Sequence, residues 1–432
     1  MNASEISNSF EQRKQLTLMP PDILAAHQLK RLNQLFTKIL PDNDFYRRHC
    51  EQANLPSDFQ FGSLEEITKL PFTFKDQLAS QSGHGNFAEN LTFDRSQYCR
   101  FHRTSGTQGK PLVVLDTAED WQWWINTWQF VLDSADIQSS DTLLMAFSFG
   151  PFIGFWSAFD AAVARGALCI PSGGLSTLSR IELIQSSDAN VIFCTPSYAL
   201  HLAEVATENQ ITVGNLSIEK IIVAGEPGGS IPEIKNQIET IWQAKVYDHA
   251  GASEVGPWGF ADPAARGMYI NEAEFIAEFL SIEHSGPAGE GELSELVLTN
   301  LGRYGSPIIR YRTGDLVRPT WNDDQDCQFV LLTGGVLGRA DDMMIVRGVN
   351  IFPSSIEQIL RSFPEVVEYR MTAVKDGQMD QLMIEIEDRL EKPDRVVKEL
   401  QVRLGLRVDV TCVPIGSLPR FDLKGKRFID KR

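Results

Sequence analysis

The sequence predicts an α/β protein with a large N-terminal domain of mainly parallel sheets and crossover helices, followed by a small α+β C-terminal domain. From about residue 100 to residue 316, short apolar runs alternate with helical patterns, as in a parallel sheet whose strands are joined by helices. After Asp341, shorter helix and strand patterns follow closely on one another. Since 432 residues exceed the roughly 250 to 300 at which a single core stops growing, we expect two domains, residues 1–340 and 341–432.

The N-terminal part begins with a predicted amphipathic helix over residues 20–40, whose apolar face is expected to pack on the main body. Four apolar runs further along the chain predict buried strands of the parallel sheet, each followed by Gly, Pro or Ser. Loops at the carboxyl ends of such strands usually bind ligands. The four runs are LLMAF (143–147), ALCIP (167–171), NVIFC (190–194) and KIIVAGE (220–226).

The C-terminal part begins with a predicted helix, because Ser354 and Glu357 have the spacing of a capping box ahead of an apolar helix face. A strand is expected next, then a second helix that ends at Gly405, then another strand over residues 406–412. The residues that mark the strand and the second helix are Leu382, Ile384, Ile386, Val397, Leu400 and Leu404.

The composition excludes several classes of partner. A net charge of −17 repels phosphate backbones and anionic lipids, so nucleic acid and membranes are not expected partners. The uncharged stretch from Thr142 to Phe159 approaches spanning length, but its Gly, Pro and Ser residues favour a buried aromatic loop. The N-terminus lacks the regions of a signal peptide, and the six cysteines have no zinc or redox spacing. We therefore expect a cytoplasmic protein without a structural zinc site.

Residues 103–111, RTSGTQGKP, have the chemistry of a phosphate-binding loop. Glycines let the backbone approach phosphate oxygens, hydroxyl groups add donors, and Lys110 adds a positive charge. The spacing is not that of a Walker loop, which would require glycine in place of Thr104 and a hydroxyl group in place of Pro111. Taken alone, the loop is also compatible with a plain hairpin turn.

Further segments stand in the order found in one enzyme family. The loop resembles the SSGTTGKP loop of adenylate-forming ligases, and the set from Thr104 to the C-terminus resembles the phenylacetate–coenzyme A ligase branch. An ordered set of this kind is far more specific than any of its members. The segments are CIPSGG (169–174), FCTPSYALHL (193–202), AGEP (224–227), GASE (251–254), IRYRTGDL (309–316), GRADDMMIVRGVNIFPSS (338–355) and LPRFDLKGKRFIDKR (418–432).

The resemblance implies an enzyme that uses ATP and Mg²⁺ to activate a carboxylic acid as its acyl-adenylate, then transfers the acyl group to coenzyme A. It assigns Glu254 to the metal, Asp315 and Arg339 to the ribose, and Asp341 to the hinge of a mobile C-terminal domain. Ala250 replaces an aromatic residue that is frequent in the family, so adenine stacking falls to Tyr247, His249 or another residue. The nucleotide-binding residues it implies are Thr104, Ser105, Gly106, Thr107, Gly109, Gly225, Glu226, Pro227, Asp248, Ser253, Asp315 and Arg339.

Adenylation requires cations, because a carboxylate attacks the α-phosphate while pyrophosphate leaves. Lys110, a Mg²⁺ ion at Glu254 and a lysine of the tail are expected to supply them. An alignment without gaps from Pro419 to Asp430 assigns the catalytic lysine to Lys424. The family's Gly-Lys pair favours Lys426 instead, and a solvated basic tail is the third interpretation.

The acid is expected beside the phosphate loop and the GASE segment, in contact with Gly251 and Ala252. The uncharged aromatic stretch 147–159 is the predicted pocket wall, with Phe149, Phe152 and Trp156 as lining residues. An aromatic or otherwise apolar acid follows from this composition. A plain core role is the competing interpretation for each of the three aromatic residues.

Two other functions stay open at this point. An adenylating enzyme with another acceptor, such as a carrier protein, an amine or a coenzyme that receives the nucleotidyl group, would share the ATP motifs. A non-catalytic nucleotide-binding module is the less favoured interpretation, because a binder has no use for Glu254 and the tail lysines. A homodimer is compatible with the sequence as well.

Overall fold

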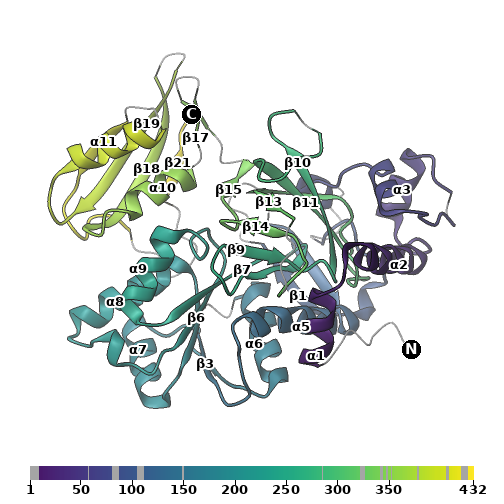
Figure 1. The fold of residues 1–432 in the computed structure, drawn as a ribbon, viewed down its shortest axis with the longest axis horizontal. Helices are drawn as coiled ribbons and strands as arrows, with labels where there is room; N and C mark the ends of the chain where they lie inside the picture. Colours follow the sequence, from purple (N-terminus) through teal and green to yellow (C-terminus); the bar gives the residue numbers. More distant parts are fainter. Residues whose placement is uncertain are drawn as a thin grey trace.

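The computed structural model describes residues 9–432 except 57, 80–86, 105–110, 148–149, 285, 322–325, 341–343, 347–348, 352, 377–378, 405–407 and 420–426. The expected α/β class, with a large N-terminal and a small C-terminal domain, is confirmed (Figure 1). The large domain holds the major sheets, and the small domain lies beside its α8–α9 end.

In the described part of the chain, nine strands form the largest sheet, in the order β13-β14-β9-β8-β7-β6-β5-β3-β4. Each neighbouring pair from β4 to β7 is parallel, whereas β7 and β8 are antiparallel. β4 follows β3 in the chain and lies on one side of it, whereas β5 follows β4 and lies on the other side of β3. The strand order therefore changes direction between β3 and β5, and such a switch point is where ligands bind in open α/β sheets. The strands are β3 (Thr142–Met145), β4 (Leu168–Pro171), β5 (Val191–Cys194), β6 (Lys220–Val223), β7 (Lys245–Ala252), β8 (Gly256–Ala261), β9 (Gly267–Ile270), β13 (Pro319–Thr320) and β14 (Leu331–Thr333).

Helices cover both faces of this sheet. Since side chains alternate along each strand, a single strand contributes residues to the core on each face. Leu143 and Met145 of β3 join the core that includes α5 and α6, whereas Leu144 joins the core that includes α7, α8 and α9. Strands buried on both faces explain the continuous apolar runs in the sequence. The helices are α5 (Ala118–Ser134), α6 (Ile153–Arg165), α7 (Thr177–Ser187), α8 (Pro196–Glu208) and α9 (Pro232–Trp242).

One expectation about this sheet is wrong. The run ALCIP was expected to form a buried strand, but β4 is the edge strand, and Leu168 is 62% exposed. An apolar run does not reveal whether a strand lies at the centre or the edge of a sheet, because that depends on which strands pair with it.

A second sheet and the N-terminal helices complete the large domain. The expected amphipathic helix is present as α2, which buries Leu32, Leu35, Phe36 and Ile39. The antiparallel sheet β10-β11-β12-β15 and the hairpin β1-β2 stand beside the major sheet. Their bounds are α1 (Phe10–Thr17), α2 (Pro21–Ile39), α3 (Asp44–Gln52), α4 (Lys75–Leu78), β1 (Tyr98–Arg103), β2 (Val113–Thr117), β10 (Phe275–Ser281), β11 (Ser294–Asn300), β12 (Tyr311–Val317) and β15 (Gly338–Arg339), with short 3-10 helices at Leu64–Lys69, Arg95–Gln97 and Val213–Asn215.

The small domain has its own core, formed where α10 and α11 pack on the sheet β20-β19-β18-β21. The expected helix begins at Pro353, one residue before Ser354, so Ser354 does not precede the helix as a capping box requires. Proline is favoured at a first helical position, because its missing N–H would have no partner there. The elements are β16 (Met344–Val346), β17 (Val349–Ile351), α10 (Pro353–Arg361), β18 (Val366–Asp376), β19 (Met379–Asp388), α11 (Pro393–Leu404), β20 (Asp409–Cys412) and β21 (Phe428–Asp430).

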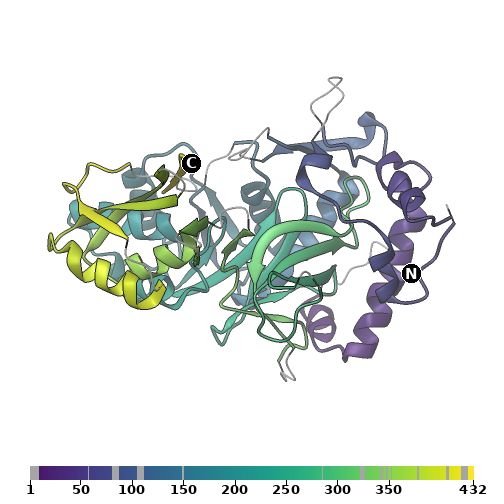
Figure 2. The same ribbon diagram turned by 90° about the horizontal axis from the view of Figure 1, so that it is seen from above.

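The two domains meet at α9, where Glu233 contacts the small domain. Gln358 of α10 donates to its carboxylate at 3.0 Å, and Arg403 of α11 lies 3.7 Å from it. Both views place the small domain on this side of the molecule (Figures 1 and 2). These two contacts across the interface are polar and partly exposed.

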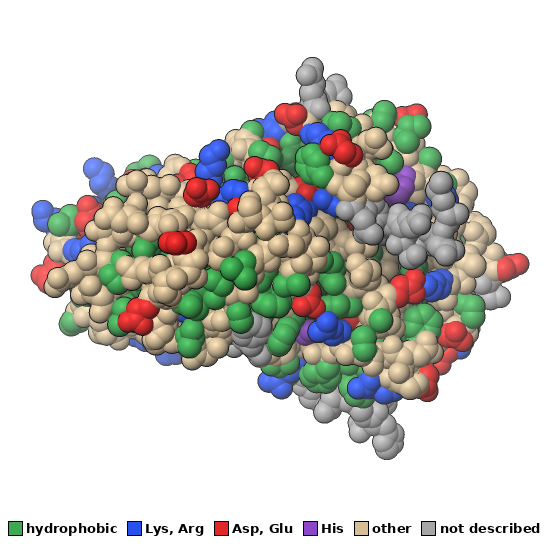
Figure 3. Space-filling model, turned by 90° about the horizontal axis from the view of Figure 1, so that it is seen from below, with side chains coloured by type: hydrophobic (Ala, Val, Ile, Leu, Met, Phe, Trp, Pro, Cys, Tyr) green, Lys and Arg blue, Asp and Glu red, His purple; other side chains and the backbone are tan. Residues whose placement is uncertain are grey.

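Acidic and basic side chains are interspersed on the face seen in Figure 3. The net charge of −17 is thus not gathered into a single acidic block on that face. Among the helices that the structure describes, none is long and apolar enough to cross a membrane.

Candidate active site

Several predicted residues follow the carboxyl ends of neighbouring parallel strands. Gly225 and Pro227 follow β6, and Gly251 to Glu254 lie at the end of β7 and in the turn that follows it. Gly225 has a φ of 92°, a left-handed conformation that glycine adopts without strain. The Glu226 carboxylate accepts a 2.7 Å hydrogen bond from the Ser197 N–H at the start of α8, so its visible role is to cap that helix.

Asp248 lies at the same sheet edge but is buried. Ser230 Oγ donates to its Oδ2 at 2.6 Å, and burial raises the pKa of its carboxyl to about 6. A Cβ on Gly229 would come within 2.6 Å of this carboxyl group, so only glycine fits there. Asp248 therefore supports the turn that follows β6. His249 is also buried, with its ring 4.1 Å from that of Trp128, so it is a core residue.

Glu254 lies in a polar group inside the large domain. Its Oε1 accepts a 2.7 Å hydrogen bond from the Tyr311 hydroxyl and lies 3.3 Å from the Lys75 ammonium. Burial opposes ionisation of Glu254, but the Lys75 charge and the Tyr311 hydrogen bond outweigh it and hold its pKa below the usual value. Burial and the Glu254 charge raise the pKa of Tyr311 well above normal. The pair is thus a carboxylate and a neutral phenol.

Asp315 and Arg339, both assigned to the ribose, are brought together by the pairing of β12 with β15. They are register partners, and Arg339 Nη1 donates to Asp315 Oδ1 at 3.1 Å. Both charges act on Tyr311, which links this pair to Glu254. Contacts between positions 57 and 24 residues apart in the sequence therefore form one polar group in the fold.

The phosphate loop is closed at its base by Thr104. The Thr104 N–H donates to the Leu112 carbonyl at 2.9 Å, and the Leu112 N–H donates to Thr104 Oγ1 at 3.0 Å. The preceding residue, Arg103, donates its N–H to the Pro151 carbonyl at 2.8 Å. The base of the loop is therefore fixed beside the aromatic segment that follows β3.

The aromatic segment divides between core and partly exposed positions. Phe155 is buried in the core, as the competing core interpretation expects of such rings. Phe152 precedes α6 and is partly exposed, while Trp156 is partly buried and donates its indole N–H to the Gly150 carbonyl at 3.0 Å. Phe152 and Trp156 thus have surface available at the β3 to β5 switch point.

Some predicted residues lie outside the described part of the chain, and their placement stays a prediction. They are Ser105, Gly106, Thr107, Gly109, Lys110, Phe149, Asp341, Lys424 and its alternative Lys426.

Two residues of the polar group were not predicted from the sequence. Tyr311 lies inside the matched segment IRYRTGDL, so the resemblance carried a signal for it. Lys75 of α4 lies before every matched segment and 179 positions before Glu254, and nothing in its local sequence distinguishes it from a surface lysine. Only the fold brings it to Glu254.

A two-domain α/β fold in which an ionised glutamate at the end of β7 lies beside an Asp–Arg pair of the second sheet is the arrangement of an adenylate-forming ligase. Residues 348–432 match the AMP-binding enzyme C-terminal domain family. The chain is 30% identical to the phenylacetate–coenzyme A ligase of Thermus thermophilus, over 97% of this chain and 99% of that protein. It is 31% identical to the same enzyme of Escherichia coli, over 95% of each.

The protein belongs to the phenylacetate–coenzyme A ligase family and is an AMP-forming acid–coenzyme A ligase. It superposes on 2-hydroxyisobutyryl-CoA ligase in the postadenylation state with a TM-score of 0.91, at 26% identity over 100% of this chain and 95% of that one. With the same enzyme in the thioesterification state the TM-score is 0.74, at 27% identity and the same coverage. The present structure is therefore more similar overall to the postadenylation structure of that relative than to its thioesterification structure.

Proposed function

We propose that this ligase activates an aromatic or otherwise apolar carboxylic acid. The observation that carries the proposal is the aromatic segment after β3, which joins the base of the phosphate loop through Arg103 and Pro151. It stands at the switch point between β3 and β5, where α/β sheets bind ligands. Phe152 and Trp156 there favour an apolar group, and the carboxylate of the acid would point toward the loop. Gly251 and Ala252 would form the facing wall.

We assign Glu254 to a Mg²⁺ ion that arrives with ATP. The residues fit such an ion, because Mg²⁺ is commonly bound by one or two carboxylates together with substrate phosphates. Glu254 is a single buried carboxylate held in its ionised form, and its neighbour Tyr311 is neutral. When bound, the ion would neutralise charge on the phosphates.

The residues of this chain supply the remaining binding and alignment. Asp315 can accept hydrogen bonds from both ribose hydroxyl groups, with Arg339 holding its other side. Lys75 and Lys110 place positive charge near the phosphates, and the tail lysine, which we assign to Lys424, would approach the attacking carboxylate. Alignment and charge neutralisation account for most of the catalysis of phosphoryl and nucleotidyl transfer.

For the second step, the small domain would turn about a hinge at Asp341, the first residue of the proposed C-terminal domain 341–432. The lysine is then exchanged for a path that admits the coenzyme A thiol. Two arrangements of one relative, with TM-scores of 0.91 and 0.74 to this chain, support such a motion. We expect the reaction in the cytoplasm, and a homodimer remains a prediction for size-exclusion measurements.

The test is pyrophosphate release with a panel of acids that differ in apolar size, with and without coenzyme A. We expect ATP-dependent and Mg²⁺-dependent release with aryl or other apolar acids, and acyl-thioester only when coenzyme A is present. Small hydrophilic acids should be poor substrates. A preference for those acids would overturn the proposed substrate class.

A further inference from the structure

The two peptide carbonyls that flank Glu254 are both held by one segment of the chain. Arg303 Nη1 donates to the Ser253 carbonyl at 2.9 Å, and Asn300 Nδ2 donates to the Val255 carbonyl at 2.9 Å. Asn300 and Arg303 have no exposed surface. The backbone on each side of Glu254 is therefore fixed from the end of β11 and the connection that follows it.

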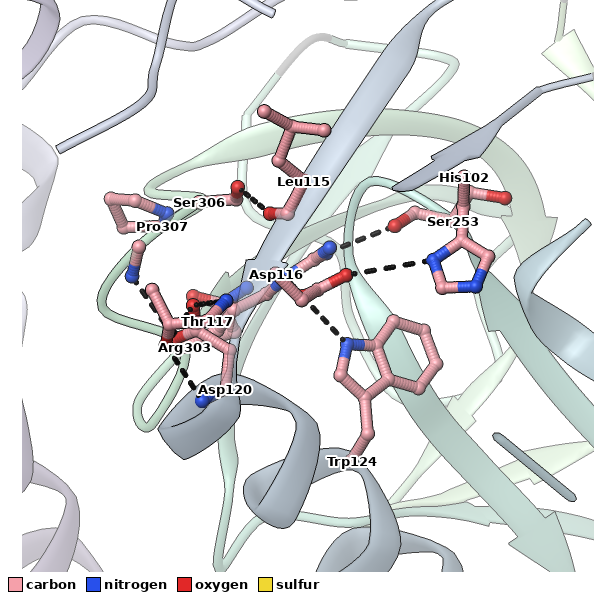
Figure 4. Close-up of polar contacts among 12 residues, drawn as sticks. His102, Leu115, Asp116, Thr117, Asp120, Trp124, Ser253, Arg303, Ser306 and Pro307 are labelled. Atoms are coloured by element: carbon pink, nitrogen blue, oxygen red, sulfur yellow. Dashed lines mark hydrogen bonds and ion pairs between the residues drawn. The ribbon is translucent and has the colours of Figure 1, made fainter. Parts of the chain in front are cut away.

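Arg303 also connects this turn to the hairpin that carries the phosphate loop. Its Nε donates to Asp116 Oδ1 at 2.7 Å, and Asp116 lies on β2, the partner strand of β1 (Figure 4). Trp124 donates to the same oxygen at 3.2 Å, and His102 of β1 lies 3.8 Å from Asp116 Oδ2. One guanidinium group thus joins β2, a strand of the hairpin that carries the phosphate loop, to the residue before Glu254.

The segment that carries Arg303 is held to β2 and α5 at further points. The Gly305 N–H donates to Asp120 Oδ1 at 3.0 Å, and Ser306 Oγ donates to the Leu115 carbonyl (Figure 4). A Cβ on Gly305 would lie 2.3 Å from Asp120 Oδ2, so glycine is needed for this approach. Arg303 therefore projects from a rigid support.

Stability alone is a weak explanation for this arginine. A fully buried ion pair pays a desolvation penalty that its attraction often fails to recover, and apolar replacements of such pairs are frequently neutral or stabilising. Arg303 Nη2 also has no hydrogen-bond partner among the described residues. What the arginine provides that an apolar side chain would not is a fixed direction for the Ser253 carbonyl.

We propose that Arg303 is a positioning residue that aims the Glu254 carboxylate at the metal of the nucleotide; this rests on the proposed metal role of Glu254. Rotation of the Ser253–Glu254 peptide would swing the carboxylate, and Mg²⁺ tolerates little departure from octahedral geometry. Binding sites lose function when their supporting groups are displaced by about 1 Å. Loss of Arg303 should therefore weaken the coupling between metal and ATP more than it weakens ATP binding itself.

The experiment measures ATP affinity by calorimetry without acid, once with Mg²⁺ and once with EDTA. The ratio of the two dissociation constants gives the gain due to the metal. The test variant is Arg303→Met with Asp116→Asn, which removes both charges and leaves no unpaired buried ion. The matched control is Lys220→Met with Asp141→Asn, which removes a largely buried ion pair between the start of β6 and the residue before β3. Thermal unfolding is recorded for both.

We expect the metal-dependent gain in ATP affinity to be at least about fivefold smaller in the Arg303 double variant than in the wild type. The ATP affinity of the variant in EDTA should stay within about twofold of the wild-type value. The control should keep the gain. An unchanged gain in the Arg303 variant, when Glu254→Gln loses it, overturns the positioning role. If Glu254→Gln keeps the gain, the metal assignment of the proposed function fails instead. If the double variant does not fold, Arg303→Lys is tested against the same criteria. Lysine keeps the positive charge but cannot hold Asp116 and the Ser253 carbonyl at the same time, as the guanidinium group does.

Discussion

The Glu254 turn and the residues that flank the tail segment 420–426 are both held by buried polar side chains, and in each case these side chains belong to the same domain as the segment they hold. Tyr311, Arg303 and Asn300, all of the large domain, hold the turn. On the small domain, Arg427 forms two hydrogen bonds with Glu368, at 2.6 and 2.9 Å, and the Leu418 N–H donates to Glu387 at 2.6 Å.

The two carboxylates that hold the residues flanking the tail segment lie side by side on the sheet of the small domain. Glu368 and Glu387 are register partners on β18 and β19, and each is buried. One holds the residue after the tail segment, and the other holds a residue before it. Residues on both sides of the segment are thus held by one sheet.

The contacts within each domain differ from those between the domains, and this difference explains how one active site can serve two reactions. The Glu254 turn and the residues on either side of the tail segment are each held within their own domain, whereas Gln358 and Arg403 of the small domain both contact one partly exposed carboxylate of the large domain, Glu233. Exposed pairs of this kind contribute roughly 0 to 1 kcal/mol. The domains can therefore change their arrangement without disturbing either segment, and only the adenylation step should need both segments together.

The largest effect is expected from the tail lysine. Lys424→Ala should lower pyrophosphate release on the order of 10² to 10³-fold, because it removes a cation from the transition state. Thioester formation from supplied acyl-adenylate should be nearly unchanged, since that step does not use the lysine. Lys426→Ala is the matched control and should retain most activity. The reverse result for the two lysines would transfer the catalytic role to Lys426.

Next in size is Glu254→Gln, which keeps the shape of the side chain and removes its charge. We expect pyrophosphate release to fall about 10²-fold with little change in thermal unfolding. Glu272→Gln is the control, because burial raises the pKa of that carboxyl to about 7 and it accepts one hydrogen bond, from the Val330 N–H. A wild-type rate for Glu254→Gln would refute its role in adenylation.

A smaller, step-specific effect is expected from Glu368→Gln. Weakening the pair with Arg427 should loosen one end of the tail segment and slow adenylation about tenfold, with the second step unchanged. Glu385→Gln is the matched control, because Glu385 pairs with Arg370 across the same two strands at a partly exposed site. If Glu368→Gln slows both steps equally, the pair stabilises the small domain without positioning the tail.

The smallest effect is expected at the interface between the domains. Glu233→Ala removes the acceptor for Gln358 and the charge facing Arg403, so adenylation should fall by less than about fivefold. Rates of both half-reactions, measured separately, would check this. A loss of more than about tenfold in adenylation would show that the interface is a fixed contact on which the site depends.

The sequence by itself determined the fold class, the family and the ordered motifs. Apolar runs and helical patterns are local, so the strands β3, β5 and β6 and the helix α2 could be predicted from short windows. The motif order also identified Asp315, Arg339 and Glu254, and the fold brings the first two into contact as register partners. Local patterns did not reveal that β4 is an edge strand, since the pairing of distant strands decides that.

Only the tertiary structure decided which side chains support the site. Lys75 reaches Glu254 from 179 positions away, and Arg303 joins Asp116 to the Ser253 carbonyl from a connection with no motif of its own. Glu226, assigned to the nucleotide by its motif, uses its carboxylate to cap α8. The physical reason is common to these cases: hydrogen bonds and ion pairs act over about 3 to 4 Å, and the chain segments within that range are set by the packing of the whole fold.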